Sequence, residues 1–242
     1  MRIAIFSDIH GNLEALEAVV ETLRRSSIDR YVCLGDIVGY GANPNECIGM
    51  VRSLTDTVVI GNHDHCALGL TTISDFNTYA QQAVLWTVRQ LTPENEAYLR
   101  GLPFVIRNGR YVYVHATLDR PEEWGYVFSS WQAQTCLYSI DDGQICFIGH
   151  SHRPLIFSGN NELLCAGGAC KISFGSDMKY LINVGSVGQP RDADPRASAC
   201  IVDEEEGTAE IIRIDYDISI AQRKIRAAGL PDFLADRLTR GG

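Results

Sequence analysis

The sequence predicts an α/β protein in which two stacked mixed sheets are flanked by helices. Its first sixty residues alternate short apolar runs with segments of helical periodicity, a pattern typical of parallel strands joined by helices. After residue 100, strand-like runs dominate and add further strands to the sheets. Because the chain has 242 residues, 45% hydrophobic content and no repeat or linker, we expect residues 1–242 to form a single domain.

The N-terminal elements follow from local signals. Residues 2–6 read as a strand buried on both faces, and Asn12 is a suitable N-cap for the next helix. Apolar residues recur at helical spacing from Leu13 to Leu23, which gives this helix one face for the core. The other elements predicted in this half are strands at residues 30–34 and 57–60 and a helix at residues 43–54.

The remaining elements are mostly strands. Residues 75–100 read as helical, with Pro93 at the start of a second helix. A hairpin turns around Glu206 and Gly207, and Gly229 ends a closing helix over 219–229. The other predicted strands lie at residues 110–116, 144–149, 163–166, 171–174 and 180–185.

Composition excludes several classes of protein. The formal net charge of −9 argues against broad binding to nucleic-acid backbones, which relies on a basic surface, and leaves room for a small phosphorylated substrate. The eight cysteines include no C-x-x-C pair, and a role for Cys165 and Cys170 is not favoured. The sequence shows no signal-peptide pattern and no apolar run of membrane length, so we expect a cytoplasmic protein without a membrane partner.

Most histidines follow apolar, strand-like runs. In open α/β sheets, binding sites gather beyond the carboxyl ends of the strands, so side chains placed there are expected to meet. Two carboxylates share this placement. The candidate residues at the ends of five predicted strands are Asp8, His10, Asp36, Asn62, His63, His115, His150 and His152.

Spacing within these groups favours a metal site. Asp8 and His10 are two residues apart, as are His150 and His152, so each pair can present two ligands to one point. A mixed set of imidazoles and carboxylates suits a divalent transition metal such as Mn, Fe, Ni or Zn better than Mg or Ca.

Each piece taken alone has a simpler explanation. Asp36 could form a turn, residues 61–64 could be a polar loop, and His115 could be an ordinary strand-end histidine. Scattered structural histidines would not all follow strands that end at the same edge. The combination therefore favours a metal site.

The ordered motifs resemble those of a known family. Residues 7–152 contain SDIHGN, LGDIVGYG, IGNHD, VYVHA and IGHSH, similar to the D-x-H, G-D-x-x-[DG], G-N-H-[DE], lone His and G-H-x-H motifs of the calcineurin-like metallophosphoesterases. The stretches GDIVGYGANPNECI, INVGSVGQPRD and IRAAGLPDFLADRL resemble the small prokaryotic phosphoesterase branch. Gly39 stands where many members carry an acidic residue that is not a metal ligand.

The resemblance implies a four-layer α/β/β/α sandwich with a two-metal centre above the sheets. A hydroxide bridging the two divalent metals would attack a phosphoric ester in line. Asp36 would bridge the metals. The other implied ligands are Asp8, His10 and His152 for the first metal, and Asn62, His115 and His150 for the second.

Neighbouring residues receive further expected roles. His63 would lie beside the metals and donate a proton to the leaving oxygen or stabilise developing charge. Asp64 could orient His63, or it could be a surface carboxylate. Asn12 and Arg191 lie on loops that could reach a substrate, and an arginine suits a phosphate.

Alternative functions remain open at this stage. The ester could be a phosphomonoester or a phosphodiester. A catalytically silent scaffold could share the fold, but the retained His63 favours an enzyme. A nuclease is a further alternative, which the acidic balance disfavours.

Overall fold

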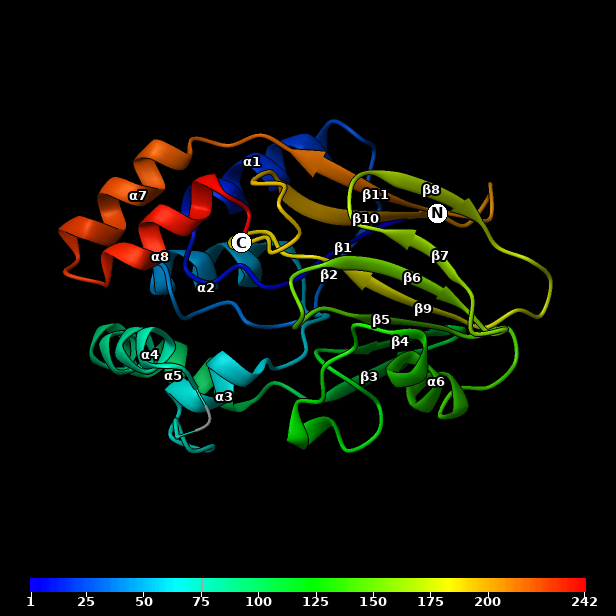
Figure 1. Ribbon diagram of the computed structural model, residues 1–242, viewed down its shortest axis with the longest axis horizontal. Coiled ribbons are helices and arrows are strands. Elements are labelled where there is room, and N and C mark those ends of the chain that lie inside the picture. The colour runs from blue at the N-terminus through cyan, green and yellow to red at the C-terminus, as the bar shows by residue number, and fades with distance from the viewer. Residues whose placement is uncertain (75) are drawn as a thin grey trace.

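The computed structural model describes residues 1–74 and 76–242 and shows two sheets packed face to face (Figure 1). Within these residues, the first sheet has the strand order β2-β1-β10-β11-β8, and the second has the order β3-β4-β5-β9-β6-β7. The strands of the first sheet are β1 (Arg2–Phe6), β2 (Arg30–Cys33), β8 (Cys170–Ser173), β10 (Ala197–Asp203) and β11 (Thr208–Ile214). Those of the second are β3 (Val105–Asn108), β4 (Tyr111–Val114), β5 (Ile145–Ile148), β6 (Pro154–Ser158), β7 (Leu163–Ala166) and β9 (Tyr180–Val184).

Helices form the outer layers. Helices α1 (Leu13–Arg24) and α2 (Pro44–Leu54) lie against the first sheet, and α6 (Ser130–Tyr138) lies against the second. Asn12 caps α1, as predicted, because its side chain accepts a hydrogen bond from the Ala15 N–H. The other helices are α3 (Asn62–Ala67), α4 (Thr78–Gln90), α5 (Pro93–Arg100), α7 (Ile218–Ala227) and α8 (Asp232–Asp236), with short 3₁₀ helices η1 (Pro121–Glu123) and η2 (Arg237–Thr239).

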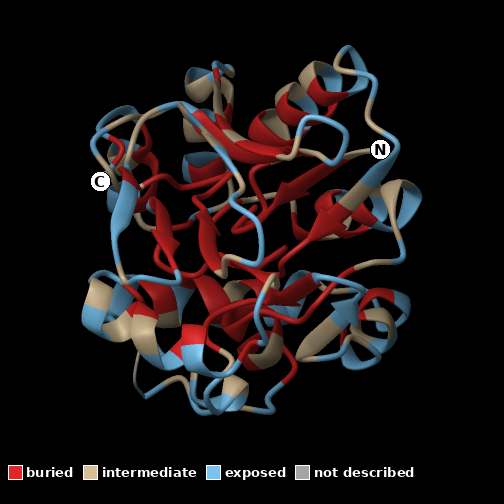
Figure 2. Ribbon diagram, turned by 90° about the vertical axis from the view of Figure 1, so that its right-hand side faces the viewer, coloured by how far each residue is buried: buried red, intermediate tan, exposed pale blue. Residues whose placement is uncertain are grey.

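Separate apolar clusters join these layers. Ile5 of β1 packs between the sheets against Phe147 of β5, whereas Phe6 on the opposite face packs with Leu16 of α1. Figure 2 shows the strands mostly buried and the outer helices exposed on one side. The predicted sandwich of two mixed sheets between helical layers is confirmed.

Strand pairing explains why both sheets are mixed. β1 is parallel to β2 and β4 is parallel to β5, but β1 is antiparallel to β10 on its other side. The predicted strand at residues 57–60 is wrong as a full strand. It forms one parallel bridge, between Val58 and Cys33, and the chain then enters α3 at Asn62.

Several elements had no clear sequence signal. Helix α3 has the sequence NHDHCA, which lacks an apolar stripe, and its first turn is fixed by Asp64, whose side chain accepts the Gly61 N–H. The strand β6 and the helices α6 and α8 were also not predicted, because such short segments depend on packing for their conformation. Residue 75, the start of the predicted helical region, lies outside the described residues.

Two of the eight cysteines are joined, contrary to the reading that gave them no role. A disulfide links Cys165 of β7 to Cys170 of β8, and so connects the edge strands of the two sheets. The other six cysteines are free and buried. Within residues 1–74 and 76–242, none of the helices combines the length and apolar character needed to cross a membrane.

Candidate metal centre

The polar residues predicted to meet do converge at one edge of the sheets. Asp8 follows β1, Asp36 follows β2, His115 follows β4 and His150 follows β5. Because β1 is parallel to β2 and β4 to β5, each pair of strands ends at the same edge. All four side chains are buried.

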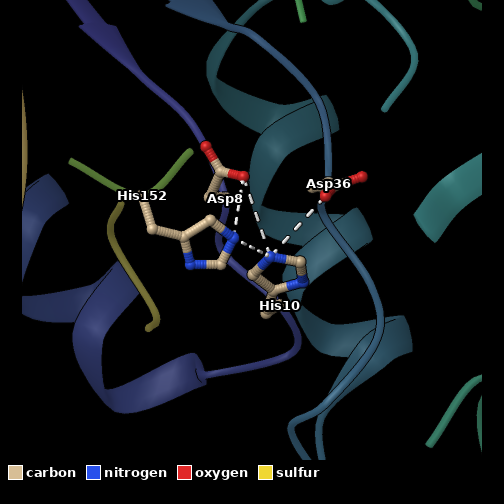
Figure 3. A group of neighbouring side chains, drawn as sticks. All are labelled: Asp8, His10, Asp36 and His152. Atoms are coloured by element: carbon tan, nitrogen blue, oxygen red, sulfur yellow. Dashed lines mark hydrogen bonds and ion pairs between the residues drawn. The ribbon is translucent and has the colours of Figure 1, made fainter. Parts of the chain in front are cut away.

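One group contains Asp8, His10, Asp36 and His152, and the ligand atoms of these residues lie within 4.8 Å of one another. Asp8 Oδ1 is 3.2 Å from His152 Nε2, and His10 Nε2 is 3.6 Å from Asp36 Oδ2. Figure 3 shows the His10 imidazole joined to both carboxylates and to His152, whereas His152 is joined to Asp8 and His10. These separations match donor atoms placed around one ion at about 2.0–2.2 Å.

A second group shares Asp36 with the first. The ligand atoms of Asp36, His115 and His150 lie within 4.8 Å of one another, and His115 Nε2 is 3.3 Å from Asp36 Oδ2. Asn62 also belongs here, because its Oδ1 atom lies 3.2 Å from His115 Nε2. The seven residues predicted as ligands are therefore collected into two adjoining groups with Asp36 in common.

The hydrogen bonds of the imidazoles fit a cation. The Nδ1 atoms of His10, His115 and His152 contact backbone carbonyl oxygens of Val38, Leu34 and Gln189. Since carbonyl oxygens only accept, each Nδ1 must carry a proton, which leaves the Nε2 atom of each ring as the nitrogen that can bind a metal ion. His150 Nε2 and Asp8 Oδ1 are buried without hydrogen-bond partners. These inward-facing acceptors are the donor set that a metal ion requires.

The backbone at these residues is unusual. Five of the seven have positive φ angles between 51° and 64°, a region that costs about 1–3 kcal/mol for residues other than glycine. The left-handed conformation lets the chain turn twice within three residues and direct both side chains of a D-x-H or H-x-H pair inward. The five residues are Asp8, His10, Asp36, His150 and His152.

Mutual electrostatics shift the ionisation of the site. Burial alone would raise the pKa of Asp36, but the imidazoles of His115, His63 and His10 lower it below its usual range. Burial opposes protonation of His115, but the Asp36 carboxylate raises the His115 pKa to about 9. Burial, with His115 nearby, lowers the pKa of His150 to about 3. The Asp36 carboxylate thus favours positive charge on His115, whereas burial favours the neutral form of His150.

His63 lies beside both groups without belonging to either. Its ring centroid is 4.8 Å from that of His10, 4.5 Å from that of Tyr40 and 4.6 Å from that of Phe76. Its Nδ1 atom is buried without a partner, and burial lowers the pKa of the ring. The His63 N–H donates to Asp36 Oδ1 at 2.8 Å. This contact ties the backbone of His63 to the shared carboxylate.

The expected roles of Asp64 require correction. Its side chain is fully buried, so it is not a surface carboxylate, and it does not hold the unpartnered His63 Nδ1 atom. Asp64 instead accepts the N–H groups of Val38 at 3.0 Å and Gly61 at 3.1 Å. Burial and the nearby Asp36 raise the Asp64 pKa to about 7. Asp64 therefore joins the two loops that carry Asp36 and His63.

Asn12 is likewise engaged in structure. Besides capping α1, its Nδ2 atom donates to the Gly188 carbonyl at 2.9 Å and to the Tyr216 hydroxyl at 3.4 Å. Its side-chain amide thus has structural partners, and the expected contact with substrate stays a prediction.

Arg191, in contrast, lies next to the metal ligands. Its N–H donates to the His152 carbonyl at 3.1 Å. Its Nη2 atom donates to the Gln189 Oε1 atom at 2.8 Å and to the Tyr40 hydroxyl at 3.3 Å. The guanidinium is thus held at the rim of the site.

Sequence reasoning missed a set of aromatic side chains around the site, which consists of Tyr40, Phe76, Tyr126 and Phe128. Tyr40 and Phe76 pack on His63, and Tyr126 stacks on His150 with ring centroids 4.0 Å apart. Tyr126 and Phe128 stack in turn and are about half exposed. Tyr40 lies only four residues after Asp36, so its place near the site could have been predicted from the sequence. Nothing in the sequence around Phe76 indicates that it packs on His63.

Comparisons place these features among known proteins. The model of the calcineurin-like phosphoesterase superfamily domain matches residues 1–207. The chain is 44% identical to the uncharacterised protein MJ0912 of Methanocaldococcus jannaschii, over 99% of this chain and 98% of that protein. It is 29% identical to the symmetrical bis(5'-nucleosyl)-tetraphosphatase of Methylococcus capsulatus, over 65% of this chain and 58% of that protein. A crystal structure of a metallophosphoesterase from Sphaerobacter thermophilus superposes with a TM-score of 0.89 and 38% identity, over 100% of this chain and 99% of that one.

Proposed function

Since the chain belongs to the calcineurin-like phosphoesterase superfamily, we propose that it hydrolyses phosphoric esters at a centre of two divalent transition-metal ions. The observation that carries this proposal is the position of Asp36, whose carboxylate is shared by two adjoining ligand groups. The mixed nitrogen and oxygen donors suit Mn, Fe, Ni or Zn. The proposed ligands are Asp8, His10, Asp36, Asn62, His115, His150 and His152.

The residues of the site would have different roles in the hydrolysis of the ester. Two bound metals would supply Lewis acidity for a phosphoryl oxygen and make water a nucleophile near neutral pH. Asp36 remains ionised and fixes the separation of the two ligand groups. His63, whose ring faces the site without joining a ligand group, donates a proton to the leaving oxygen as its bond to phosphorus breaks, or stabilises the charge that develops there. The buried Tyr40 ring, packed on both His10 and His63, limits the access of bulk water to this side of the site.

The proposed substrate is a small phosphoester in the cytoplasm. The net charge of −9 supports a compact substrate rather than a nucleic acid, because an acidic protein offers little general attraction for the phosphodiester backbone of DNA or RNA. The similarity to a bis(5'-nucleosyl)-tetraphosphatase supports a nucleotide as one candidate. Tyr126 and Phe128, half-exposed beside His150, offer a flat apolar surface for a ring of that kind.

Turnover of chromogenic esters tests the proposal. Protein freed of metal by chelation is assayed with bis(p-nitrophenyl) phosphate and p-nitrophenyl phosphate, before and after addition of Mn. We expect hydrolysis of at least one ester only after Mn is added, and a large loss in the His152→Ala variant. Full activity after exhaustive chelation would overturn the metal assignment, and no activity with any metal would favour a silent scaffold on this fold.

A further inference from the structure

Two arginines beside the proposed metal centre have no acidic partner. The Nε atoms of Arg191 and Arg237 are both buried without a hydrogen-bond partner. Among residues 1–74 and 76–242, neither guanidinium forms an ion pair with a carboxylate; Arg191 bonds to Tyr40 and Gln189, and Arg237 lies 5.3 Å from the ring centroid of Phe233. Both side chains are only partly exposed, and cations that are partly withdrawn from water are normally paired, so an anion from outside the chain would stabilise them.

The arginines come from distant parts of the sequence, but both are placed near Tyr40. Arg191 donates to the Tyr40 hydroxyl, and Leu234 and Leu238, on either side of Arg237, share an apolar cluster with the Tyr40 ring. The C-terminal segment that carries Arg237 returns to the loop of Arg191, where the Ala193 N–H donates to the Gly241 carbonyl at 2.8 Å. Burial and the charge of Arg191 lower the pKa of Arg237 to about 10. Their mutual repulsion, uncompensated by acid, is the electrostatic condition that an anion would relieve.

Tyr40 connects this pair to the metal ligands. Its ring centroid is 4.7 Å from that of His10, and the guanidinium carbon of Arg191 lies 5.6 Å from the Tyr40 centroid. Arg191 also donates its N–H to the carbonyl of His152. The Tyr40 ring therefore lies between the Arg191 guanidinium and His10 of one ligand group.

The adjoining surface is also positive. A cavity of about 510 Å³ opens beside Arg191 and is lined as well by Arg153 and Arg240. The acidic residue lining it, Asp192, is already paired with the buried Arg213. Positive charge thus concentrates locally in a chain whose net charge is negative.

We propose that Arg191 and Arg237 bind a second phosphate group of the substrate while the scissile phosphate occupies the metal centre. Guanidinium groups match phosphate oxygens in geometry and stay charged at neutral pH. The substrate class is accordingly a phosphoester or phosphoanhydride with at least two phosphates. This inference rests on the proposed function and narrows its substrate.

Binding of two non-hydrolysable nucleotides tests the inference independently of turnover. Calorimetry with the Mn-loaded protein, at fixed free Mn, compares α,β-methylene-ADP with a phosphonate analogue of AMP in which carbon replaces the ester oxygen. We expect the wild type to bind the diphosphate about 10–100-fold more tightly, the value of a charge-assisted hydrogen bond or two. Arg237→Gln should reduce this ratio to near 1, and Arg237→Lys should retain part of it.

Controls separate the proposed contact from a structural effect. Arg223→Gln removes an exposed arginine of α7 that hydrogen-bonds only to Ser219 among the described residues, and it should leave the ratio unchanged. Equal binding of the two ligands by the wild type, or equal weakening of both by Arg237→Gln, would overturn the second-phosphate site. Because the assay needs no hydrolysis, this result is distinct from failure of the chromogenic assay, which would overturn the proposed function.

Discussion

The Nε2 atoms of His10 and His152 face each other at 3.0 Å, while the Nδ1 atom of each ring contacts a backbone carbonyl. With both protons on Nδ1, the facing atoms are two lone pairs, which repel each other. A cation between them converts this repulsion into two coordinate bonds. The same reasoning applies to the unpartnered His150 Nε2 and Asp8 Oδ1 atoms.

Metal binding should therefore raise thermal stability. A ligand bound only by the native state stabilises it by about 2.7 kcal/mol at a hundredfold excess over its Kd, which is several degrees in Tm for a chain of this size. Differential scanning calorimetry of chelated protein with and without Mn measures the shift. His152→Ala should show a smaller shift, and an unchanged wild-type Tm in excess Mn would argue against a preformed site.

His63→Gln should separate catalysis from metal binding. We expect near-normal metal content by elemental analysis but a kcat roughly 10²–10⁴-fold lower, because the ring lies outside both ligand groups. Alkyl esters should lose more activity than nitrophenyl esters, since a poor leaving group needs the proton. Depletion of metal, or an equal loss with both esters, would show that His63 has another role.

Asp64→Asn should act mainly through stability. The carboxylate accepts two backbone N–H groups, and an amide can accept only one of them while presenting a donor to the other. We expect a loss of about 1–3 kcal/mol in the free energy of unfolding, measured by urea denaturation of the metal-free protein. Unchanged stability combined with the rate loss of His63→Gln would instead restore the orienting role that the structure does not support.

Glycine at position 61 should be required by the closeness of Asp36. A Cβ atom there would lie 2.1 Å from Asp36 Oδ1 and 2.2 Å from the Asp36 backbone nitrogen. Gly61→Ala is thus expected to reduce stability by about 1–3 kcal/mol or more and to lower metal affinity.

Gly49→Ala is the matched control for that substitution. Gly49 lies in α2, and a Cβ atom there meets nothing within 4 Å. Removing a glycine from an exposed helix should stabilise the protein by about 0.5–1 kcal/mol without changing metal affinity. Tolerance of Gly61→Ala equal to that of Gly49→Ala would contradict the close approach of the two loops.

The convergence of the polar residues that follow the strands could be predicted from their order and spacing in the sequence. Apolar runs marked β1, β2, β4 and β5, and polar groups directly after parallel strands must reach the same edge of a sheet. This local logic predicted the convergence of Asp8, Asp36, His115 and His150. It also predicted the sandwich of two mixed sheets, because alternating helices and later strands need two layers to bury their apolar faces.

The structural roles of Asp64 and Arg237 could not be predicted from the sequence, because they depend on residues that are distant along the chain. Asp64 bonds to Val38, 26 positions away, and Arg237 feels the charge of Arg191 because the C-terminal segment packs back on the loop after His152. No periodicity or motif encodes which buried polar atom finds a partner. Hydrogen bonds and ion pairs between distant segments form only when packing fixes the orientation of those segments. Tertiary structure alone therefore showed that Asp64 joins two loops and that Arg237 has no acidic partner among the described residues.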